Sequence, residues 1–447
     1  MKNKSLLMTE GNIQQKMVKF AIPIFLGDLF QQFYNVVDAL IVGNVLGKDA
    51  LAAVTSTGSL IFLLVGFFGG MFSGVGVVIS KLFGAGDEEK VRRAVGTAVA
   101  FGFVSGCVLT VIGVAFTPSI LRLMGTPDEV FVNSAAYIRT YFMGIIFVIM
   151  YNTANGIFRA IGDSRHPLYY LMVSSVVNVI LDLVFVAGLD MGVRGAAIAT
   201  VISQGVSVLL AFRRLITVKD VYRVEWKFIR LDKKLIAQML RIGIPAGVQN
   251  SVIALANVVV QSNINSFGSA AMAGCGAYAK VEGFAFIPIT SFSMSLTTFV
   301  SQNIGAGQYD RVKKGARFGI LASVILAEII GIIFYLFAPE LIGLFDKDPD
   351  VIRYGVGRAE IDAVFFCLLA CSHAMAGVFR GAGKSFVPMV VMLACWCVIR
   401  VTYITIITSF INEIEVIYWA YPLTWSLSSI AFIIYYFKSN WVRSIEQ

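Results

Sequence analysis

Charged residues are scarce in this chain. Asp, Glu, Lys and Arg make up 14% of its 447 residues, whereas the hydrophobic types make up 57%. Soluble domains carry about 25% charged residues and about 45–50% apolar ones. A soluble core cannot hide so much apolar surface, and disordered chains are polar, so the composition excludes both classes. It favours an integral membrane protein.

Histidine and cysteine are also rare. The chain has only two His and six Cys, and no two Cys stand in a C-x-x-C pair. We therefore expect neither a disulfide framework nor a zinc site. Since no nucleophile and base stand in a recognisable pattern, we expect no enzymatic activity and no cofactor beyond a coupling ion.

Long apolar runs fill most of the sequence. A helix needs about 20 mainly apolar residues to cross a bilayer. The sequence predicts an all-α membrane protein with an N-terminal six-helix lobe (1–214), a charged linker (215–235) and a C-terminal six-helix lobe (236–447). The twelve predicted spans are about 18–42, 50–80, 93–117, 131–158, 167–188, 193–214, 236–266, 271–301, 315–338, 353–379, 386–410 and 415–437.

Lys and Arg cluster on one side of the predicted spans. Most of the 36 basic residues fall on the side that holds the N-terminus, the linker and the C-terminus. The opposite loops are sparse or acidic, as at Asp346, Asp348 and Asp350. Because cytoplasmic loops carry the excess of Lys and Arg, we expect both termini in the cytoplasm of a cell-membrane protein. The net charge of +9 is then a topology signal, and we expect no nucleic acid partner.

The two halves repeat one another at an offset of 221 residues. Ser80–Gly86 recurs as Ser301–Gly307, and Gly156–Pro167 recurs as Gly377–Pro388. An even number of spans separates the copies, so both lobes insert in the same orientation, related by a pseudo-twofold axis along the membrane normal. Transporters built from such repeats bind substrate between the lobes near the midplane.

Three groups of motifs stand out against this background. They are the segment Asn35–Gly43, the Gly-Ala-Gly turns at 84–86 and 305–307, and the Phe-Arg turns at 158–159 and 379–380. With twelve spans in two lobes, they resemble the multidrug and toxic compound extrusion (MATE) family over essentially the whole chain. The resemblance implies a secondary active antiporter that exports amphiphilic, often cationic, drugs or metabolites in exchange for H⁺ or Na⁺. Its partners would be small-molecule substrates and the lipid bilayer, and we expect a monomer.

The first lobe carries oxygen-bearing side chains on three predicted spans. In one branch of the MATE family, a cation site is formed by an Asp on helix 1, Asn-x-x-x-Asp on helix 5 and a Thr on helix 6. The resemblance assigns these roles, and a possible Na⁺ site, to Asp38, Asn178, Asp182 and Thr200. An all-oxygen set suits a hard cation, and two close carboxylates repel until one takes up a proton, so both ions remain open. The repeat counterparts are Val259, Ile399, Tyr403 and Tyr421, so we expect coupling in the first lobe alone.

Further polar residues within the spans are candidates for a substrate cavity. Lys280, Glu282 and Arg400 bring both charge signs to the second lobe, and Arg400 is the expected partner of Glu282. They form either a buried ion-pair network or a patch for zwitterionic or anionic substrates. Glu328 is expected to face another helix and His373 to pack in the interior. The candidate cavity residues are Tyr34, Asn35, Gln204, Asn257, Gln261, Lys280, Glu282 and Arg400.

Two alternative functions stay open beside multidrug export. One is a flippase for lipid-linked precursors, from the same superfamily, and the other is an exporter dedicated to one metabolite. Flippases of that kind usually have more helices and a basic cavity, so twelve spans and acidic residues in the first lobe count against the first alternative.

Overall fold

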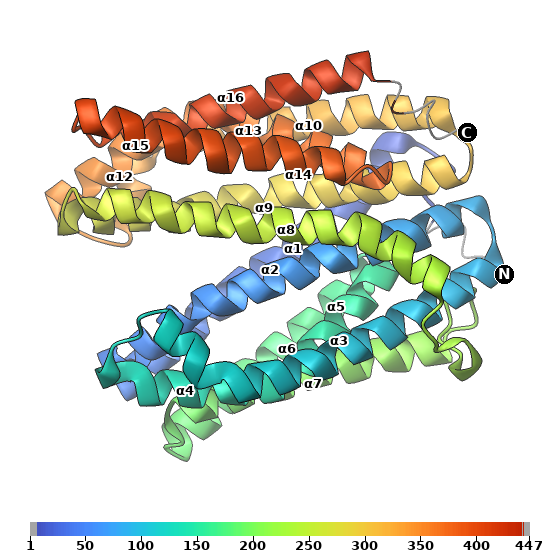
Figure 1. The fold of residues 1–447 in the computed structure, drawn as a ribbon, viewed down its shortest axis with the longest axis horizontal. Coiled ribbons are helices and arrows are strands. Elements are labelled where there is room, and N and C mark those ends of the chain that lie inside the picture. Colours follow the sequence, from blue (N-terminus) through green and yellow to red (C-terminus); the bar gives the residue numbers. More distant parts are fainter. Residues whose placement is uncertain (1–6, 440, 442–447) are drawn as a thin grey trace. The chain divides into compact units, whose positions relative to one another are not determined.

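Helices make up nearly all the regular structure, and no strand occurs in residues 7–439 and 441, the part of the chain that the computed structural model describes. Several side chains between residues 48 and 62 lie outside this description. The elements of the first half are α1 (Ile13–Leu46), α2 (Lys48–Ala85), α3 (Glu88–Leu123), α4 (Asp128–Met143), α5 (Ile145–Ala160), α6 (Arg165–Asp182), η1 (Leu183–Gly188), α7 (Gly192–Thr217) and η2 (Trp226–Phe228) (Figure 1).

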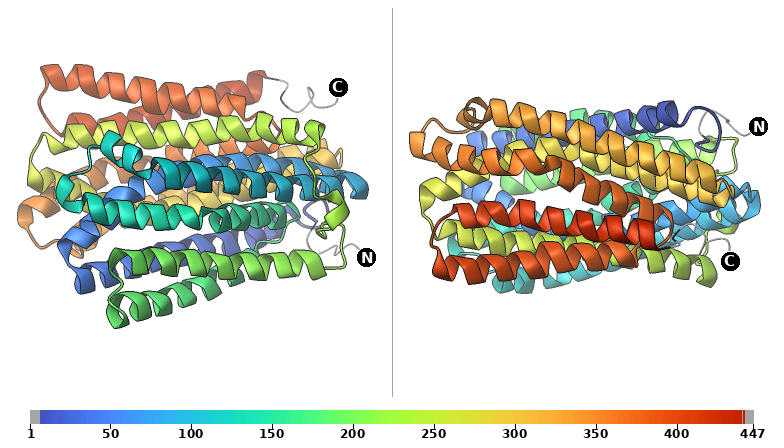
Figure 2. Two further views of the ribbon diagram at one scale, coloured as in Figure 1. Left: turned by 60° about the horizontal axis from the view of Figure 1, so that its bottom comes forward. Right: turned by 90° about the horizontal axis from the view of Figure 1, so that it is seen from above.

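The second half is also helical, with some of its spans divided into shorter pieces. Its elements are α8 (Lys233–Asn265), α9 (Ser269–Gly305), α10 (Tyr309–Leu336), α11 (Ala338–Gly343), α12 (Pro349–Asp362), η3 (Ala363–Phe365), α13 (Phe366–Gly381), α14 (Phe386–Met392), η4 (Leu393–Ile399), α15 (Arg400–Phe410) and α16 (Glu415–Lys438). Each predicted span coincides with one helix or with consecutive helical pieces, and the ends differ by only a few residues. Figure 2 shows the same helices from two further directions.

Most of these helices have the length and composition of membrane spans. Ten of them qualify among the described residues, and α4 with α5, bent by 48° at their junction, gives an eleventh. Helix α1 is not among the ten because polar side chains such as Gln31, Gln32 and Asn35 lower its hydropathy. Its 34 residues would nevertheless extend about 50 Å, more than a bilayer core requires. The predicted all-α membrane class is therefore confirmed.

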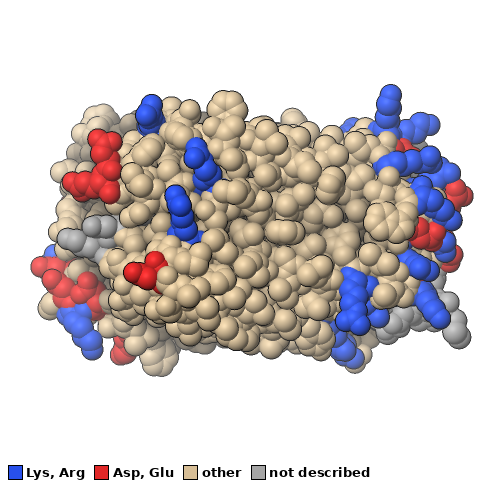
Figure 3. Space-filling view, turned by 90° about the horizontal axis from the view of Figure 1, so that it is seen from below, with Lys and Arg blue, Asp and Glu red and all other residues tan. Residues whose placement is uncertain are grey.

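Charged side chains are distributed unevenly over the surface. On the face drawn in Figure 3, Lys and Arg gather at one end, and a broad band of uncharged surface separates them from the charged residues toward the other end. Such a band matches what lipid tails would cover.

The helices group into two compact units. The first consists mainly of Pro23–Arg241, and the second of Met8–Ile22 together with the residues from Ile242 onward. Helix α1 therefore begins in the second unit and continues into the first at Pro23. Within the second unit, Gln302 accepts a hydrogen bond from the Met8 backbone N–H at 2.8 Å. The Arg311 guanidinium donates to the Met8 carbonyl oxygen at 3.1 Å.

The charged linker is held against α3 within the first unit. Glu225 accepts from Arg92 at 3.0 Å and pairs with Lys227 at 3.1 Å, and the Thr97 hydroxyl donates to the Arg230 carbonyl at 3.1 Å. The hydrogen bond from Lys227, together with the charge of Arg92, holds the pKa of Glu225 below its ordinary value. Glu225 consequently stays ionised at neutral pH.

Three irregular turns in the long helices adjoin buried charged residues. The π-helix η1 follows Asp182, the 3-10 turn η3 follows Asp362, and the π-helix η4 precedes Arg400. Such turns widen or tighten the helix and redirect the side chains beside them, and π-turns are frequent at functional sites. Each of these irregular turns therefore lies next to a charged side chain that is buried among the helices.

Small residues allow close helix packing in the second unit. Helices α9 and α12 pack against each other, and a Cβ added to Gly274 of α9 would stand 2.9 Å from the Gly355 backbone nitrogen of α12. Two glycines thus let the two backbones approach, as is common in membrane helix pairs.

We expect Gly274→Ala to lower the free energy of unfolding by about 1–3 kcal/mol, because the added methyl group must displace the α12 backbone. The matched control is Gly276→Ala on the same helix, where an added Cβ meets nothing within 4 Å. The melting temperatures of the two purified variants in detergent check this. Equal melting temperatures would contradict the close packing.

Candidate functional site

Two carboxyl groups of the first unit face one another. Asp38 lies on α1 and Asp182 is the last residue of α6, and their side chains act directly on each other. Asp182 is fully buried. Among the described residues, no basic side chain pairs with either acid, and neither Asp182 oxygen nor Oδ1 of Asp38 has a hydrogen-bond donor. The pair therefore lacks any compensating positive charge within the described chain.

Asn178 lies one turn before Asp182 on the same face of α6. It is 1% exposed, and neither atom of its amide group finds a hydrogen-bond partner in the described part of the chain. Buried polar atoms are almost always satisfied, so both atoms of this amide remain able to bond a water molecule or an ion. The amide oxygen and the carboxylates are the donors that a hard cation prefers.

Thr200 lies on α7, which packs against α6. Its hydroxyl donates to the Ala196 carbonyl oxygen of its own helix at 3.1 Å, so its oxygen can still act as an acceptor or ligand. Gln204 follows one turn later and is partly exposed. The described residues contain no cluster of three His, Cys, Asp or Glu that could hold a metal ion. A cation in this unit would need the amide and hydroxyl oxygens beside the two acids.

The second unit holds buried charges of both signs. Arg358 on α12 donates to Glu282 of α9 at 3.4 Å and to Asp362, one turn along its own helix, at 3.1 Å. The expected pairing of Glu282 with Arg400 is therefore wrong at the level of direct contact. Arg400 instead donates two hydrogen bonds to the Thr424 hydroxyl, at 2.8 and 3.2 Å. Helix α12 packs against α9, and this places Arg358 next to Glu282.

Aromatic rings separate the two buried guanidinium groups. The Tyr421 ring centre lies 4.5 Å from Arg358 and 4.3 Å from Arg400, and Tyr278 lies 4.9 Å from Arg358. Cations over aromatic faces gain further attraction when water is excluded. The two Arg and two acids of this cluster sum to zero formal charge, unlike the acid pair of the first unit.

Comparison with known proteins identifies the family. The model described as MatE matches residues 23–184 and 245–412, one stretch in each half. The chain belongs to the MATE family. The "Probable multidrug resistance protein YoeA" of Bacillus subtilis (strain 168) is 31% identical over 438 residues, which are 96% of this chain and 94% of that protein.

Other MATE relatives differ in the cargo that their names state. The "FAD transporter" of Shewanella oneidensis is 23% identical over 430 residues, covering 94% of this chain and 93% of its own length. Among solved structures, a superfamily transporter from Pyrococcus furiosus aligns with a TM-score of 0.92 at 20% identity, covering 100% of both chains. The Vibrio cholerae MATE transporter VcmN, as its D35N mutant, aligns at 0.89 with 22% identity over 96% of this chain and 98% of its own. At these identities the structures show the shared fold alone.

Sequence reasoning missed two buried tyrosines of this MATE protein, one of which interacts with the acid pair. Tyr137 and Tyr141, one turn apart on α4, are buried. Tyr137 interacts electrostatically with Asp38 and Asp182, and Tyr141 with Tyr34. The spacing of two tyrosines on one face of an apolar span could have shown them. Tyr34, which sequence reasoning named, interacts with both acids.

The remaining candidate cavity residues are scattered. Asn35 and Asn257 are exposed, and Gln261 donates to Asn265 at 2.9 Å. Lys280 is also exposed, with its ammonium 5.4 Å from the Phe345 ring centre, and its contacts do not include Glu282. None of these four side chains is fully buried, unlike Glu282 and Arg400.

The other two intramembrane candidates of the second unit pack as expected. Glu328 accepts a hydrogen bond from the Cys367 backbone N–H at 3.3 Å, at the start of α13. His373 packs its ring against Phe286 and Trp396, with ring centres 5.8 and 5.4 Å apart. Glu328 thus faces a neighbouring helix, and His373 fills space among aromatic side chains.

We expect Arg358→Met to lower the free energy of unfolding by about 3–5 kcal/mol, because it strands two buried carboxylates. Arg353→Met on the same helix is the matched control, since Arg353 pairs with Asp350 on the surface and such pairs contribute about 0–1 kcal/mol. Thermal unfolding in detergent measures both. Similar melting points for the two variants would argue against the buried network.

Proposed function

We propose that this MATE protein is a secondary active antiporter that exports amphiphilic compounds in exchange for H⁺ or Na⁺. The names of its relatives support the export of drugs. Besides the Bacillus subtilis protein, the "Multidrug export protein MepA" of Staphylococcus aureus (strain MW2) is 23% identical over 393 residues, which are 86% of this chain and 85% of that protein. We also propose that the chain acts as a monomer with both termini in the cytoplasm.

The contrast between the two units carries the proposal. In the second unit, Glu282 and Asp362 both pair with Arg358. In the first unit, Asp38 and Asp182 interact with each other, and no described Arg or Lys pairs with either of them. Two neighbouring carboxylates in a poorly solvated site repel each other strongly. A proton or a cation that binds between them would compensate their negative charge, as Arg358 does for the acids of the second unit. The first unit is therefore the place for a mobile positive charge.

The acid pair supplies the chemistry of coupling. A proton would neutralise one carboxyl and let it donate to the other. A Na⁺ ion would instead take oxygen ligands from both acids, with the amide of Asn178 and the hydroxyl of Thr200 completing the set. Either cation removes the repulsion between the acids and so changes which packing of the surrounding helices is favoured. A substrate that binds the opposite state is then moved against its gradient.

The membrane supplies sufficient energy for this exchange. One elementary charge that moves down 100 mV releases about 2.3 kcal/mol. A tenfold concentration ratio of substrate requires about 1.4 kcal/mol. A single cation per cycle is therefore enough to accumulate a neutral substrate more than tenfold, before any contribution from the ion's own gradient.

Asp38→Asn should abolish gradient-driven transport, because the amide can neither release a proton nor bind a cation as a carboxylate does. The assay follows ethidium, a lipophilic cation, in proteoliposomes under a pH gradient or a Na⁺ gradient applied separately. The gradient that drives wild-type transport identifies the ion. Undiminished transport by Asp38→Asn would refute the coupling site.

Glu328→Gln is the matched control, since it also neutralises an intramembrane acid but keeps an oxygen for the Cys367 N–H. We expect it to transport at the wild-type rate. If wild type carries no ethidium under either gradient, the same vesicles can be tested with a fluorescent lipid or with FAD, the cargo named for one relative. Flipping of the lipid alone would favour the flippase alternative, and transport of FAD alone would favour a dedicated exporter.

A further inference from the structure

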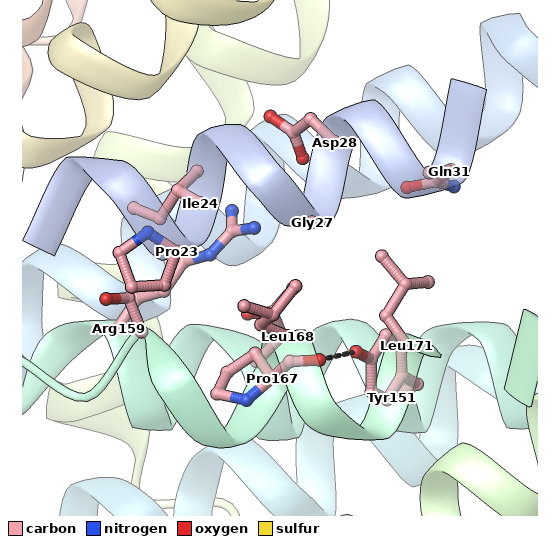
Figure 4. A pocket seen from close by; sticks show the side chains of 12 residues that line it. Pro23, Ile24, Gly27, Asp28, Gln31, Tyr151, Arg159, Pro167, Leu168 and Leu171 are labelled. Atoms are coloured by element: carbon pink, nitrogen blue, oxygen red, sulfur yellow. Dashed lines mark hydrogen bonds between the residues drawn. The ribbon is translucent and has the colours of Figure 1, made fainter. Parts of the chain in front are cut away.

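A small cavity lies within the first unit, between α1 and the adjoining ends of α5 and α6 (Figure 4). It offers about 40 Å³ to water, which is room for about two or three molecules. In Figure 4, Arg159 extends from α5 toward α1, and Asp28 and Gln31 lie along α1. The polar residues that line the cavity are Asp28, Gln31, Tyr151, Asn155, Arg159 and Ser164.

The lining is more polar than packing alone requires. Asp28 experiences the positive charge of Arg159, and Tyr151 interacts with both of them. The Tyr151 hydroxyl itself donates to the Pro167 carbonyl oxygen at 3.0 Å. The Asn155 side-chain oxygen is buried and has no hydrogen-bond partner within the described residues. Water in the cavity would satisfy this oxygen, so the cavity has the polarity and the size to be wet.

The internal repeat shows that the fold does not need an acid here. Arg159 has Arg380 as its counterpart, and that guanidinium donates to the Ser293 hydroxyl at 3.1 Å. The counterpart of Asp28 is Gln249 at the main offset or Asn250 in the Pro23–Pro245 register, and both are neutral amides. The second unit thus keeps the arginine without the acid. Asp28 occurs only in the unit that also holds the unbalanced acid pair.

A polar stripe connects Asp28 with Asp38. Gln31 and Asn35 stand between them at spacings of three, four and three residues, which keeps all four side chains on one face of α1. The separation along the helix axis is about 15 Å. Gln31 already lines the cavity, so the stripe leads from the water-sized space toward the acid pair.

We propose that Asp28 is the group that passes the coupling proton from the acid pair to the cytoplasm. This inference rests on the proposed function and specifies its ion as H⁺. In the transfer, the O–H bond of the protonated acid pair breaks, and the proton passes along waters beside the stripe to an oxygen of the Asp28 carboxylate. The donor is left as a carboxylate and Asp28 as a neutral acid. Asp28 then gives the proton to water at the cytoplasmic end, where the charge of Arg159 stabilises the carboxylate that remains.

The surroundings of Asp28 fit such a relay. Arg159 and Tyr151, both from α5, are the titratable groups among the residues that line the cavity, and α6 contributes Leu168 and Leu171. The structure records no ion pair within 4 Å between Asp28 and any described residue. An acid that lies near a cation, but forms no direct ion pair with it, can exchange a proton with water.

The first test uses full-length protein in proteoliposomes with ethidium as the probe. We expect Asp28→Asn to slow transport driven by a pH gradient about tenfold or more, while gradient-free exchange of ethidium stays within about twofold of wild type, because only the first needs net proton transfer. Unchanged driven transport would overturn the proposal. So would an equal loss of both activities, which would indicate a structural or substrate-binding role.

The second test does not depend on a transported substrate. Infrared difference spectra between acidic and alkaline buffer detect carboxyl groups that gain or lose a proton. We expect one carboxyl band of the wild type to be missing in Asp28→Asn. Identical spectra would overturn the relay even if the transporter carries no ethidium.

Two further variants separate the relay from packing. Asp28→Glu keeps a carboxyl group in the cavity and should retain more driven transport than Asp28→Asn. Glu328→Gln, in the second unit, should leave driven transport unchanged, and a loss equal to that of Asp28→Asn would overturn the specific role. The Asp38→Asn variant tests the proposed function and not the relay. If that variant transports at the wild-type rate, the assignment of the coupling site is refuted.

Discussion

Removing a carboxylate from water costs several kcal/mol unless an arginine, a proton or a metal ion compensates its charge. The two halves of this chain meet that requirement differently. The second unit surrounds Glu282 and Asp362 with Arg358 and Arg400, so its charges sum to zero. The first unit leaves Asp38 and Asp182 without such a partner in the described chain. An apolar environment makes this difference decisive, because a missing counter-charge must then come from outside the protein.

The helices are interrupted where these charges lie. A regular α-helix closes every backbone hydrogen bond, and this suits a lipid environment. The turns η1, η3 and η4 depart from that pattern beside Asp182, Asp362 and Arg400 respectively. Each turn redirects the side chains beside it relative to those of a regular helix.

Helix α1 has a special position in this arrangement. Its first turns belong to the second unit, its remainder from Pro23 belongs to the first, and it carries Asp38. Proline lacks the N–H that would bond to the preceding turn, so Pro23 marks the point at which this helix deforms most readily. The backbone of Met8 is bound by Gln302 and Arg311 of the second unit. Their repeat counterparts, Lys81 and Lys90, differ from this pair, so the first half does not reproduce the same binding site.

The sequence by itself determined the class, the twelve helical segments and the family, since these depend on local hydropathy and on short motifs. It also indicated Asp38, Asn178, Asp182 and Thr200, although only through the family resemblance. Tertiary structure alone decided that Arg358 pairs with Glu282, that Tyr137 interacts with the acid pair, and that Asp28 lines a cavity with Arg159. Hydropathy and spacing show which residues share a helix face, but which faces meet depends on how the helices pack. Partners on different helices are therefore determined by the fold as a whole.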